Sequence, residues 1–428
     1  MAKNPDSDAL IAFLNASPTP FHAVETAISK LTSCEAISLD EKAPWSLKAG
    51  QTAYVVRNGS SIVAIRIPTS IQTSKLGFRI VAAHTDSPCL KLKPRGPDAT
   101  LNYRQWGVEV YGGVLNNSWL DRDLGLAGRI SHKTESGIHS QLVRTEDRPI
   151  RIPQLAIHLD RGVNENGLVL NPQRHLVPIL GLMIPPGRGL ESWLMEMSGT
   201  QLENLAFELH LYDKTPACYG GFEDEFIYSG RLDNLAMSHA ALESFCGEDA
   251  AEDHIQVMAL FDNEEVGSTS AQGANSNLLP MILERCLIAL GQSREQAMAT
   301  QARSLLISAD MAHAIHPNYP EKHEPNHFPL LNRGPVVKGN VSMRYATSGE
   351  TAAAFKAWCR NAGVPVQDFV NRTDLTCGTT IGPHVASALG IPSVDVGNPM
   401  LSMHSAREMC GSEDHGMMIR VMQEFFGA

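Results

Sequence analysis

The sequence lacks the features that mark exported and membrane-spanning proteins. Its eight cysteines are scattered through 428 residues and form no Cys-x-x-Cys pair, which is typical of a reducing, cytoplasmic compartment. The first twenty residues contain no basic flank followed by an unbroken apolar run, so we expect no secretory signal. Proline interrupts the longest apolar stretches, such as residues 176–186. These stretches are therefore much shorter than the ~20 residues needed to cross a bilayer.

Positive charge is also scarce. The chain carries 35 Lys and Arg against 46 Asp and Glu, a formal net charge of −11. A surface of this sign repels phosphate backbones and anionic lipids, so we expect neither nucleic acid nor a membrane as a partner. The hydrophobic share of 43% and the charged share of 19% are ordinary for a globular protein. The length predicts two or three domains.

Several short apolar runs are rich in β-branched residues and hydrophobic on both faces. They cover residues 78–83, 255–261, 305–309 and 393–396, and this pattern is typical of strands that helices cover on both sides. Helical spacing lies between them, for example where Leu235, Leu242 and Phe245 share one face. The alternation predicts an α/β/α sandwich built on a sheet.

The segment from residue 90 to residue 228 has a different character. It is punctuated by glycine and contains an alternating strand at residues 206–212, as β-rich domains do. Because runs of the α/β type occur on both sides of it, we predict one discontinuous α/β domain, residues 1–89 and 229–428, interrupted by a β-rich insertion, residues 90–228.

Side chains that can bind metal follow the predicted strands. His84 and Asp310 directly follow two of the runs, Glu264 and Glu265 come just after a third, and His404 lies beyond the fourth, past a Gly-Pro turn. Open α/β sheets bind their ligands at the carboxyl ends of the strands. The sequence therefore predicts a metal site at this edge of the sheet.

The number of these side chains points to two metal ions rather than one. Two imidazoles and three carboxylates exceed what one tetrahedral zinc with an open position requires, and they suit two metals that share a carboxylate. Such a site hydrolyses amide bonds through a metal-activated water. Of the adjacent acids Glu264 and Glu265, one would bind metal and the other would face the water as general base, since neighbours on an extended segment point in opposite directions. Spacing alone does not assign the two roles.

Asp86 lies two residues beyond His84. We expect its carboxylate to accept the second ring hydrogen bond of this histidine and so to fix the tautomer that binds metal. Alone, a His-x-Asp pair or an acidic pair is more often a solvated surface feature, so the prediction depends on their joint placement after separate strands.

Blocks of sequence along almost the whole chain resemble the aspartyl aminopeptidase family of co-catalytic metallopeptidases. The matching blocks are AAHTDSP (82–88), NNSW (116–119), IPQLAIHL (152–159), SGRLDN (229–234), FDNEEVGS (261–268), SADMAHA (308–314), GPVVK (334–338), RYAT (344–347), CGTTIGP (377–383) and MHSAREMCG (403–411). They occur in order and are specific as a set. The resemblance implies a zinc-exopeptidase-like catalytic domain with an inserted, β-barrel-like dimerisation domain.

The resemblance also assigns the metal ligands. It implies His84, Asp233 and Asp310 on one zinc, and Asp233, Glu265 and His404 on the other, with Asp233 as the bridge. Without it, Asp233 reads as an N-cap before the helix at residue 235. The resemblance makes Glu264 the general base. Ligands of these types also accept Co²⁺ or Mn²⁺ in place of Zn²⁺.

Four further residues owe their roles to the resemblance. It implies that His158 reaches a neighbouring subunit's active site and holds the substrate or its developing oxyanion. Direct metal contact and simple packing in a strand remain alternatives. Lys338, with Arg344 and Tyr345 close behind it, resembles the pocket that receives an acidic side chain. A cation is needed there, because the net charge of −11 repels an acidic substrate unless a local cation offsets it within a Debye length of ~8 Å.

The resemblance implies an aminopeptidase that acts on short peptides, prefers N-terminal Asp or Glu, and assembles from dimers into a tetrahedral dodecamer. Two alternatives stay open from the sequence. One is a related co-catalytic dipeptidase or deacylase, and the other is a self-assembling particle whose hydrolytic activity is vestigial.

Overall fold

The computed structural model describes residues 4–96, 101–183, 189–201, 205–247 and 253–428. The chain divides into two compact units. The α/β unit comprises Met1–Asp86, Ala217–Met403 and Glu408–Ala428, and the inserted unit comprises Ser87–Pro216 and His404–Arg407. The boundaries expected from the sequence, 1–89 with 229–428 and 90–228, stay a prediction.

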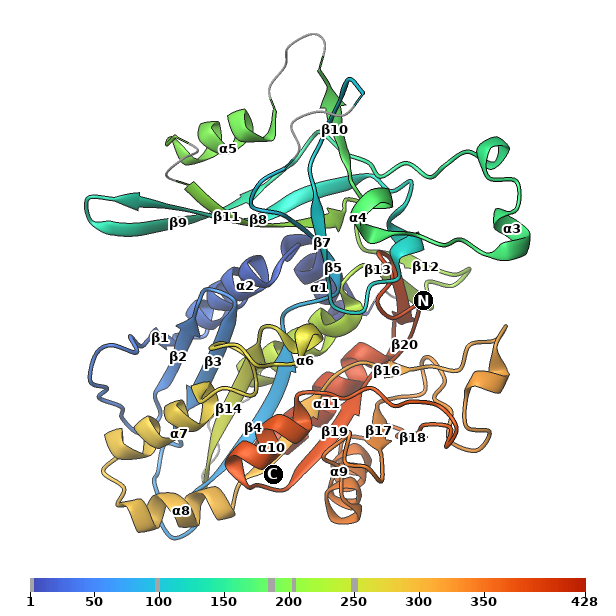
Figure 1. Cartoon of the computed structure of the whole chain (residues 1–428). Coiled ribbons are helices and arrows are strands. Elements are labelled where there is room, and N and C mark those ends of the chain that lie inside the picture. Colours follow the sequence, from blue (N-terminus) through green and yellow to red (C-terminus); the bar gives the residue numbers. More distant parts are fainter. Residues whose placement is uncertain (1–3, 97–100, 184–188, 202–204, 248–252) are drawn as a thin grey trace. The chain divides into compact units, whose positions relative to one another are not determined.

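A nine-stranded mixed sheet forms the centre of the α/β unit, with the strand order β1-β2-β3-β14-β4-β15-β19-β17-β18. The strands, in sheet order, are β1 (Ile37–Ser38), β2 (Thr52–Arg57), β3 (Ser61–Arg66), β14 (His254–Phe261), β4 (Gly77–His84), β15 (Leu305–Ala309), β19 (Ser393–Gly397), β17 (Val336–Gly339) and β18 (Gln367–Val370). The four predicted apolar runs are β4, β14, β15 and β19, which are parallel neighbours at the middle of the sheet. Their carboxyl ends therefore meet at one edge (Figure 1).

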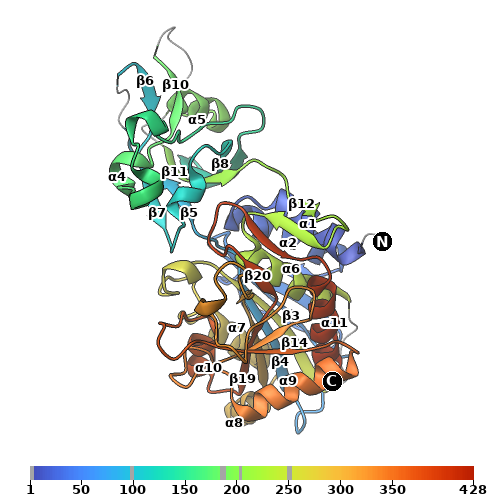
Figure 2. The same ribbon diagram turned by 90° about the vertical axis from the view of Figure 1, so that its right-hand side faces the viewer.

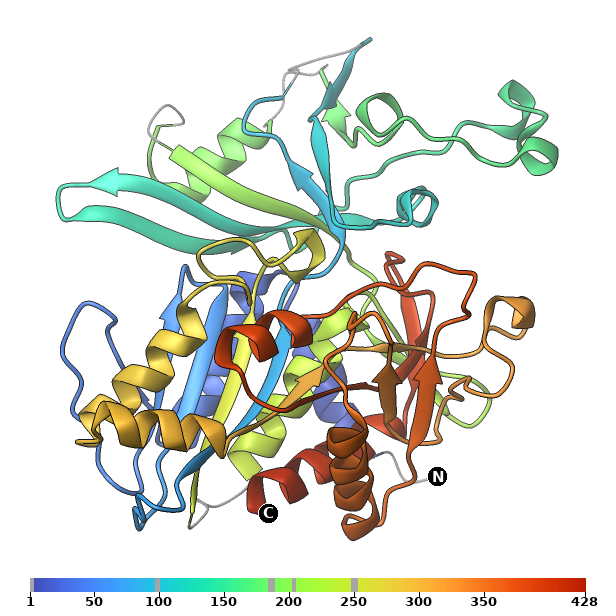
Figure 3. The ribbon, with the colours of Figure 1, turned by 60° about the horizontal axis from the view of Figure 1, so that its bottom comes forward.

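Helices cover both faces of this sheet, as the doubly apolar runs predict. They are α1 (Pro5–Ala16), α2 (Pro20–Ser33), α6 (Leu232–Gly247), α7 (Leu278–Ala289), α8 (Arg294–Ala302), α9 (Gly349–Asn361), α10 (Gly382–Leu389) and α11 (Asp414–Gly427). Val81 and Ala83 of β4 belong to the core that includes α1, α2, α6, α9 and α11, whereas Ile80 and Ala82 belong to the core that includes α7 and α10. The helices can be followed around the sheet in Figure 3.

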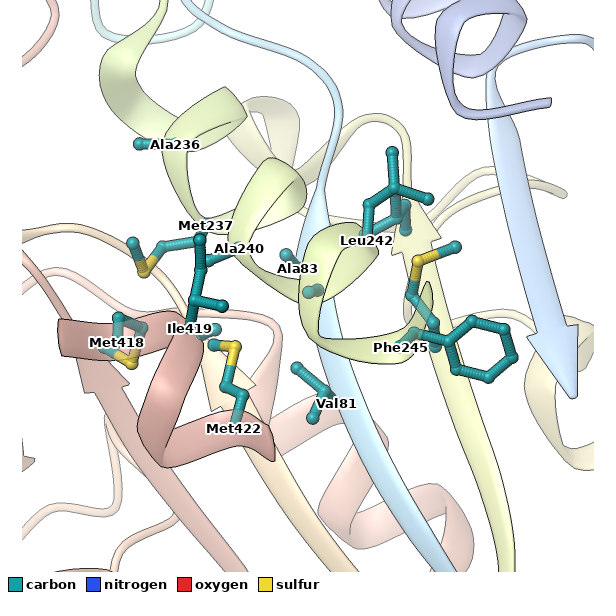
Figure 4. Close-up of a cluster of buried hydrophobic side chains, with 14 of the residues drawn as sticks. Val81, Ala83, Ala236, Met237, Ala240, Leu242, Phe245, Met418, Ile419 and Met422 are labelled. Carbon is teal, nitrogen blue, oxygen red and sulfur yellow. The ribbon is translucent and has the colours of Figure 1, made fainter. Parts of the chain in front are cut away.

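The core beneath α6 and α11 is rich in methionine and alanine. Figure 4 shows Met237 of α6 close to Met418 and Met422 of α11, with Val81 of β4 nearby. All four of these side chains are fully buried. The small side chains of α6, such as Ala240, let this helix lie close to β4. The packing fixes the beginning of α6, where Asp233 lies, relative to the sheet.

A second, five-stranded sheet belongs to the same unit. Its order is β12-β13-β21-β20-β16, formed by β12 (Cys218–Gly220), β13 (Phe226–Ser229), β21 (Glu408–Gly411), β20 (Pro399–Leu401) and β16 (Ala312–His313). β12 and β20 are labelled in Figure 2. Short 3₁₀ turns occur at η4 (Glu264–Val266) and η5 (Pro320–Lys322).

The inserted unit is β-rich, as expected. Its five-stranded sheet has the order β7-β5-β11-β8-β9, formed by β7 (Val108–Tyr111), β5 (Cys89–Leu92), β11 (Leu205–Asp213), β8 (Leu124–Thr134) and β9 (Gly137–Arg144), and β10 (Ile179–Leu182) pairs with β6 (Tyr103–Gln105). The predicted alternating strand at 206–212 lies within β11. The remaining elements are η1 (Asn116–Trp119), η2 (Ile157–Leu159), α3 (Val163–Asn166), α4 (Pro172–His175) and α5 (Leu190–Ser198). Within the described part of this unit the pairing leaves β7 and β9 as edges, so the expected barrel is not confirmed.

Candidate metal centre and active site

A cluster of acidic side chains surrounds His84, the last residue of β4. Nε2 of His84 lies 3.7 Å from Oδ1 of Asp233, 3.7 Å from Oδ2 of Asp310 and 4.0 Å from Oε2 of Glu264. These separations exceed an ordinary hydrogen bond. The three acids come from the start of α6, the end of β15 and the turn after β14, so the parallel strand ends bring together residues that are far apart in the chain.

Two groups of potential ligand atoms share the His84 imidazole. His84, Asp233 and Asp310 form one group, and His84, Glu264 and Glu265 form the other; within each group, one ligand atom per residue lies within 4.8 Å of the others. Imidazole nitrogen and carboxylate oxygen are donors that zinc accepts in hydrolytic sites. The residues present therefore fit a divalent metal at this edge of the sheet.

Asp233 owes its position to contacts around the start of α6. Asp233 and Asn234 have non-helical backbone angles and are joined by a cis peptide bond. The Asp233 N–H donates to Oε2 of Glu408 at 3.2 Å. The Asn234 amide donates to the Ala309 carbonyl at 2.9 Å and accepts the Met311 N–H at 3.3 Å, and it thereby brackets Asp310.

Asp86 holds the turn that carries the two glutamates. Its two carboxylate oxygens accept the backbone N–H groups of Glu264 and Glu265, each at 3.1 Å. Nδ1 of His84 forms a hydrogen bond with the Asp86 carbonyl oxygen at 3.1 Å, and Oδ1 of Asp86 lies 3.3 Å away. That the carboxylate fixes the tautomer of His84 stays a prediction. Burial opposes protonation of His84, but the carboxylates of Asp310 and Asp86 prevail and raise its pKa.

The expectation of an extended segment at the glutamate pair is wrong. Glu264 and Glu265 lie in the 3₁₀ turn η4, after Asn263, whose φ is +64°. A tight turn can present successive side chains to one place, and an atom from each gathers with His84. Burial raises the pKa of Glu264 to about 8 and that of Glu265 well above its ordinary value, the latter with help from the charge of Asp233. A bound cation acts in the opposite direction, because it favours the ionised ligand.

The three residues predicted to receive an acidic side chain lie in different surroundings. Lys338 is buried, and its Nζ lies 3.1 Å from Oδ1 of Asp310 and 5.5 Å from the centroid of the Tyr345 ring. Burial opposes ionisation of Asp310, yet the Lys338 ammonium and His84 hold its pKa below the usual range. The exposed Arg344 instead lines a cavity of about 870 Å³, together with Arg372.

Comparison with known proteins identifies the family. The family model described as "Aminopeptidase I zinc metalloprotease (M18)" matches residues 13–426. A curated relative from Pseudomonas aeruginosa, "Probable M18 family aminopeptidase 2", is 44% identical over 429 residues, covering 99% of this chain and 98% of its own length. A relative from Pseudomonas putida with the same description is 43% identical over 423 residues, covering 97% of each chain.

The chain belongs to the M18 family of zinc metallo-aminopeptidases.

Solved structures of M18 aminopeptidases share its fold. The structure titled "Cryo-EM structure of the Ape4 and Nbr1 complex" matches with a TM-score of 0.93 at 38% identity and covers 100% of this chain and 87% of its own. The structure titled "Crystal structure of prApe1" matches with a TM-score of 0.92 at 30% identity, covering 98% and 94%. The mixed α/β fold and the hydrolase class predicted from the sequence are thus confirmed for this M18 aminopeptidase. Among its described helices, none combines the length and apolar character needed to span a membrane.

Two predicted site residues of this M18 aminopeptidase lie in the inserted unit. Nδ1 of His404 lies 2.9 Å from the carbonyl oxygen of Gly113, which orients the ring. His158 is exposed and lies in the 3₁₀ turn η2. The alternative in which His158 packs in a strand is therefore wrong.

Sequence reasoning missed the residues that hold the ligands in place. Asn234 and Glu408 both lie within blocks that carry the family resemblance, but neither is a metal ligand by type and spacing. Ser238 is a third, since its hydroxyl donates to the His84 carbonyl oxygen at 2.6 Å. For Asn234 and Ser238 the available signal was that polar side chains interrupt an otherwise apolar helix, whereas Glu408 lies in β21, outside that helix.

Proposed function

We propose that this M18 aminopeptidase removes the first residue of short peptides with two metal ions. His84, Asp233 and Asp310 hold one ion, Asp233, Glu265 and His404 hold the other, and Asp233 bridges them. The observation that carries this proposal is the placement of Asp233 and Asp310, each with an oxygen 3.7 Å from Nε2 of His84. When bound, two such ions, most suitably Zn²⁺, polarise the scissile carbonyl and supply an activated water.

Glu264 is the general base in this proposal. Its Oε2 lies 4.0 Å from Nε2 of His84, and its backbone is held by Asp86. The Glu264 carboxylate takes a proton from the attacking water and returns it to the departing amine, which needs a side chain free to approach both atoms. Glu265 instead holds metal.

Replacing each glutamate by glutamine tests this assignment. Glu264→Gln is expected to retain two metal ions per chain while turnover falls by roughly 10²-fold or more, the scale of general-base catalysis. Glu265→Gln is the matched control, and it is expected to lose metal at one site. Full metal content in Glu265→Gln together with metal loss in Glu264→Gln would mean that the roles are reversed.

We also propose a preference for N-terminal aspartate or glutamate, with Lys338, Arg344 and Tyr345 at the substrate side chain. Two features support it: Arg344 and Arg372 line one cavity, and Lys338 adds a buried cation beside Asp310. Anilides of Asp, Glu, Leu and Ala, each with a free or a blocked amino group, test the proposal. We expect the free Asp and Glu compounds to have the highest kcat/KM. Efficient cleavage of blocked compounds would instead favour a deacylase.

Self-assembly is a further part of the proposed function. One relative is titled "Structure of S. cerevesiae mApe1 dodecamer" and is 30% identical, with a TM-score of 0.83, covering 98% of this chain and 96% of its own. We propose that this chain also assembles from dimers into a dodecamer of tetrahedral symmetry, with the inserted unit as a barrel-like dimerisation domain. The segment around His158 suits an interface, because Leu155, Leu159 and Val169 are 58%, 74% and 85% exposed. Native mass spectrometry tests the stoichiometry.

In this assembly His158 acts in the neighbouring subunit's active site. Mixing two inactive variants tests the idea, because a His158→Ala chain and a Glu264→Gln chain each retain what the other lacks. If His158 acts across the interface, refolded mixtures regain activity. In a mixed dimer the His158→Ala chain keeps its own Glu264 and receives His158 from the Glu264→Gln chain. A mixture without activity would place His158 in its own chain's site or outside catalysis.

We propose a cytoplasmic location as well. The basis is the cysteine usage, eight scattered residues without a Cys-x-x-Cys pair, which fits a reducing compartment. Cell fractionation with an antibody against the native protein tests it, and recovery in an exported fraction would contradict it.

A further inference from the structure

Asp395 is a fully buried carboxylate in β19, at the middle of the large sheet. Its register partner in β15 is Ser308. It is not one of the predicted site residues, and it belongs to neither of the two ligand groups around His84. A carboxylate removed from water must receive hydrogen bonds to offset its desolvation, so its donors reveal what it organises.

Three segments donate to this one carboxylate. The hydroxyls of Ser308 and Thr380 each lie 2.6 Å from Oδ1, and the N–H of Ala346 lies 2.5 Å from Oδ2. The Asp395 N–H in turn donates to the hydroxyl of Thr347 at 2.9 Å. Asp395 therefore joins β15, the loop at residues 344–347 and the turn at residues 378–382.

These segments carry or adjoin active-site residues. Ala346 directly follows Tyr345, whose ring lies beside the Lys338 ammonium, and Lys338 contacts Asp310. Ser308 lies two residues before Asp310 on β15. A shift of the loop at 344–347 would thus move the groups beside one proposed metal ligand.

Gly382 shows how closely the turn must approach. A Cβ added at Gly382 would lie 2.3 Å from Oδ2 and 2.5 Å from Oδ1 of Asp395, closer than any side chain tolerates. Gly382 is the first residue of α10 and needs no left-handed backbone. The glycine is required there for space alone, because the turn rests against the carboxylate.

We propose that Asp395 is a positioning residue for the aminopeptidase reaction, which fixes the loop at 344–347 and the turn at 378–382 so that the substrate side chain meets a preformed pocket. The proposal rests on the proposed location of that pocket beside Lys338 and Tyr345. A preformed pocket lowers the conformational cost of binding, so loss of Asp395 should act mainly on KM.

Two substitutions at Asp395 separate its hydrogen bonds from its charge. Asp395→Ala is expected to raise KM for an N-terminal Asp substrate about tenfold or more, with kcat and metal content changed far less. Asp395→Asn is expected to restore most of the loss, because its amide oxygen can accept the Ala346 N–H while its NH₂ donates to the hydroxyls of Ser308 and Thr380. Asp414→Asn, at another fully buried carboxylate that accepts two backbone N–H groups, controls for loss of stability alone.

Gly382 supplies a second route that does not need Asp395→Ala to fold. Gly382→Ala is expected to raise KM as Asp395→Ala does, because the new methyl group pushes the turn away from the carboxylate. In the double variant, Gly382→Ala should add little to the effect of Asp395→Ala, since the carboxylate oxygens that the methyl group would meet are gone. Gly349→Ala is the matched control, because Gly349 also begins a helix and a Cβ there meets nothing within 4 Å. Independent, additive effects of the two substitutions would overturn the proposal, as would an unchanged KM in Gly382→Ala.

Hydrogen exchange separates this proposal from the proposed pocket. Asp395→Ala and Gly382→Ala should both speed exchange at the Ala346 amide. If they do so while KM for Asp, Glu and Leu substrates stays constant, Asp395 positions the loop but the pocket lies elsewhere, and the inference falls. If KM rises equally for acidic and apolar substrates, the positioning role stands and the acidic preference fails.

Discussion

The Lys338 ammonium lies 3.1 Å from Oδ1 of Asp310, and both side chains are buried. A buried cation beside a proposed metal ligand has two expected effects. It keeps the carboxylate ionised before metal binds, and it limits the negative charge that three or four neighbouring acids accumulate. Removing one partner of such a pair leaves an uncompensated charge.

Lys338→Met is expected to destabilise the metal-free protein more than the zinc-loaded protein. The loss without metal should be on the order of 3 kcal/mol, the scale of breaking a buried pair, and bound zinc should offset part of it. Urea unfolding with and without a chelator measures both values. Lys30→Met is the control, since Lys30 pairs with Glu243 at 2.8 Å but is 39% exposed, and its loss should be below about 1 kcal/mol in both states.

Asp86→Asn is expected to weaken metal binding and turnover together, each by about 10–100-fold. In the wild type the two Asp86 oxygens accept the backbone N–H groups of Glu264 and Glu265. Asparagine keeps only one acceptor oxygen, so its NH₂ group faces one of these N–H groups and that hydrogen bond is lost. Zinc titration and steady-state kinetics measure the two losses. Asp262→Asn removes the same charge from the adjacent loop and leaves those two N–H groups with their acceptor. Equal effects in the two variants would show that charge, and not the turn, is responsible.

The elements that the sequence predicted are those whose signal is local. The runs at β4, β14, β15 and β19 are apolar over a few consecutive residues, and their alternate side chains enter two different cores. Because neighbouring parallel strands end at one edge, the ligand types that follow them predicted a site. Asp233 needed the family resemblance, since an aspartate before a helix usually serves as a cap.

The residues that sequence reasoning missed depend on contacts between distant segments. Asn234 reaches Ala309 and Met311, 75 and 77 residues away, and no local periodicity encodes such a contact. Asp395 is a polar residue within an apolar run, and its spacing does not match that of the candidate metal ligands. Its proposed role follows from its three hydrogen-bond donors, which only the structure shows. The prediction that the side chains of Glu264 and Glu265 point in opposite directions was wrong, because a 3₁₀ turn of three residues interrupts the extended chain there.

Acid is expected to destabilise the protein partly through a buried histidine pair. Nδ1 of His239 lies 2.8 Å from Nε2 of His415, and burial lowers the pKa of His415 to about 3 and that of His239 well below its usual range. Both rings are therefore neutral when folded and gain protons on unfolding below pH ~6.5, so stability present above that pH is lost as the pH falls. At pH 5 His415 should account for a loss of about 2 kcal/mol, and His239 acts in the same direction.

His415→Gln tests this by removing one of the two titrations. Between pH 7 and pH 5 the variant should lose about 2 kcal/mol less of its unfolding free energy than the wild type loses. Comparing slopes cancels the contribution of the metal site, which both proteins share. A variant slope equal to the wild-type slope would contradict the prediction.

Chelation is expected to lower the melting temperature, because the buried acids around His84 then repel one another without a cation. Zinc at 100 times its dissociation constant should raise the free energy of unfolding by about 2.7 kcal/mol per site and so restore the melting temperature. Magnesium should restore much less, since it prefers oxygen ligands and retained waters. Calorimetry with added metal measures the recovery, and Glu265→Gln should recover only the part due to one site.

The helix α11 ends at Gly427, one residue before the end of the chain, and its Met418, Met422, Phe425 and Phe426 are fully buried. Its principal packing partner is α6, which begins at Asp233. The α/β unit therefore closes its core with a helix that follows every proposed metal ligand in the chain, His404 included. A chain truncated just before α11 would keep all of these ligands without the packing that orders them, so we expect it to bind metal much more weakly than the whole chain.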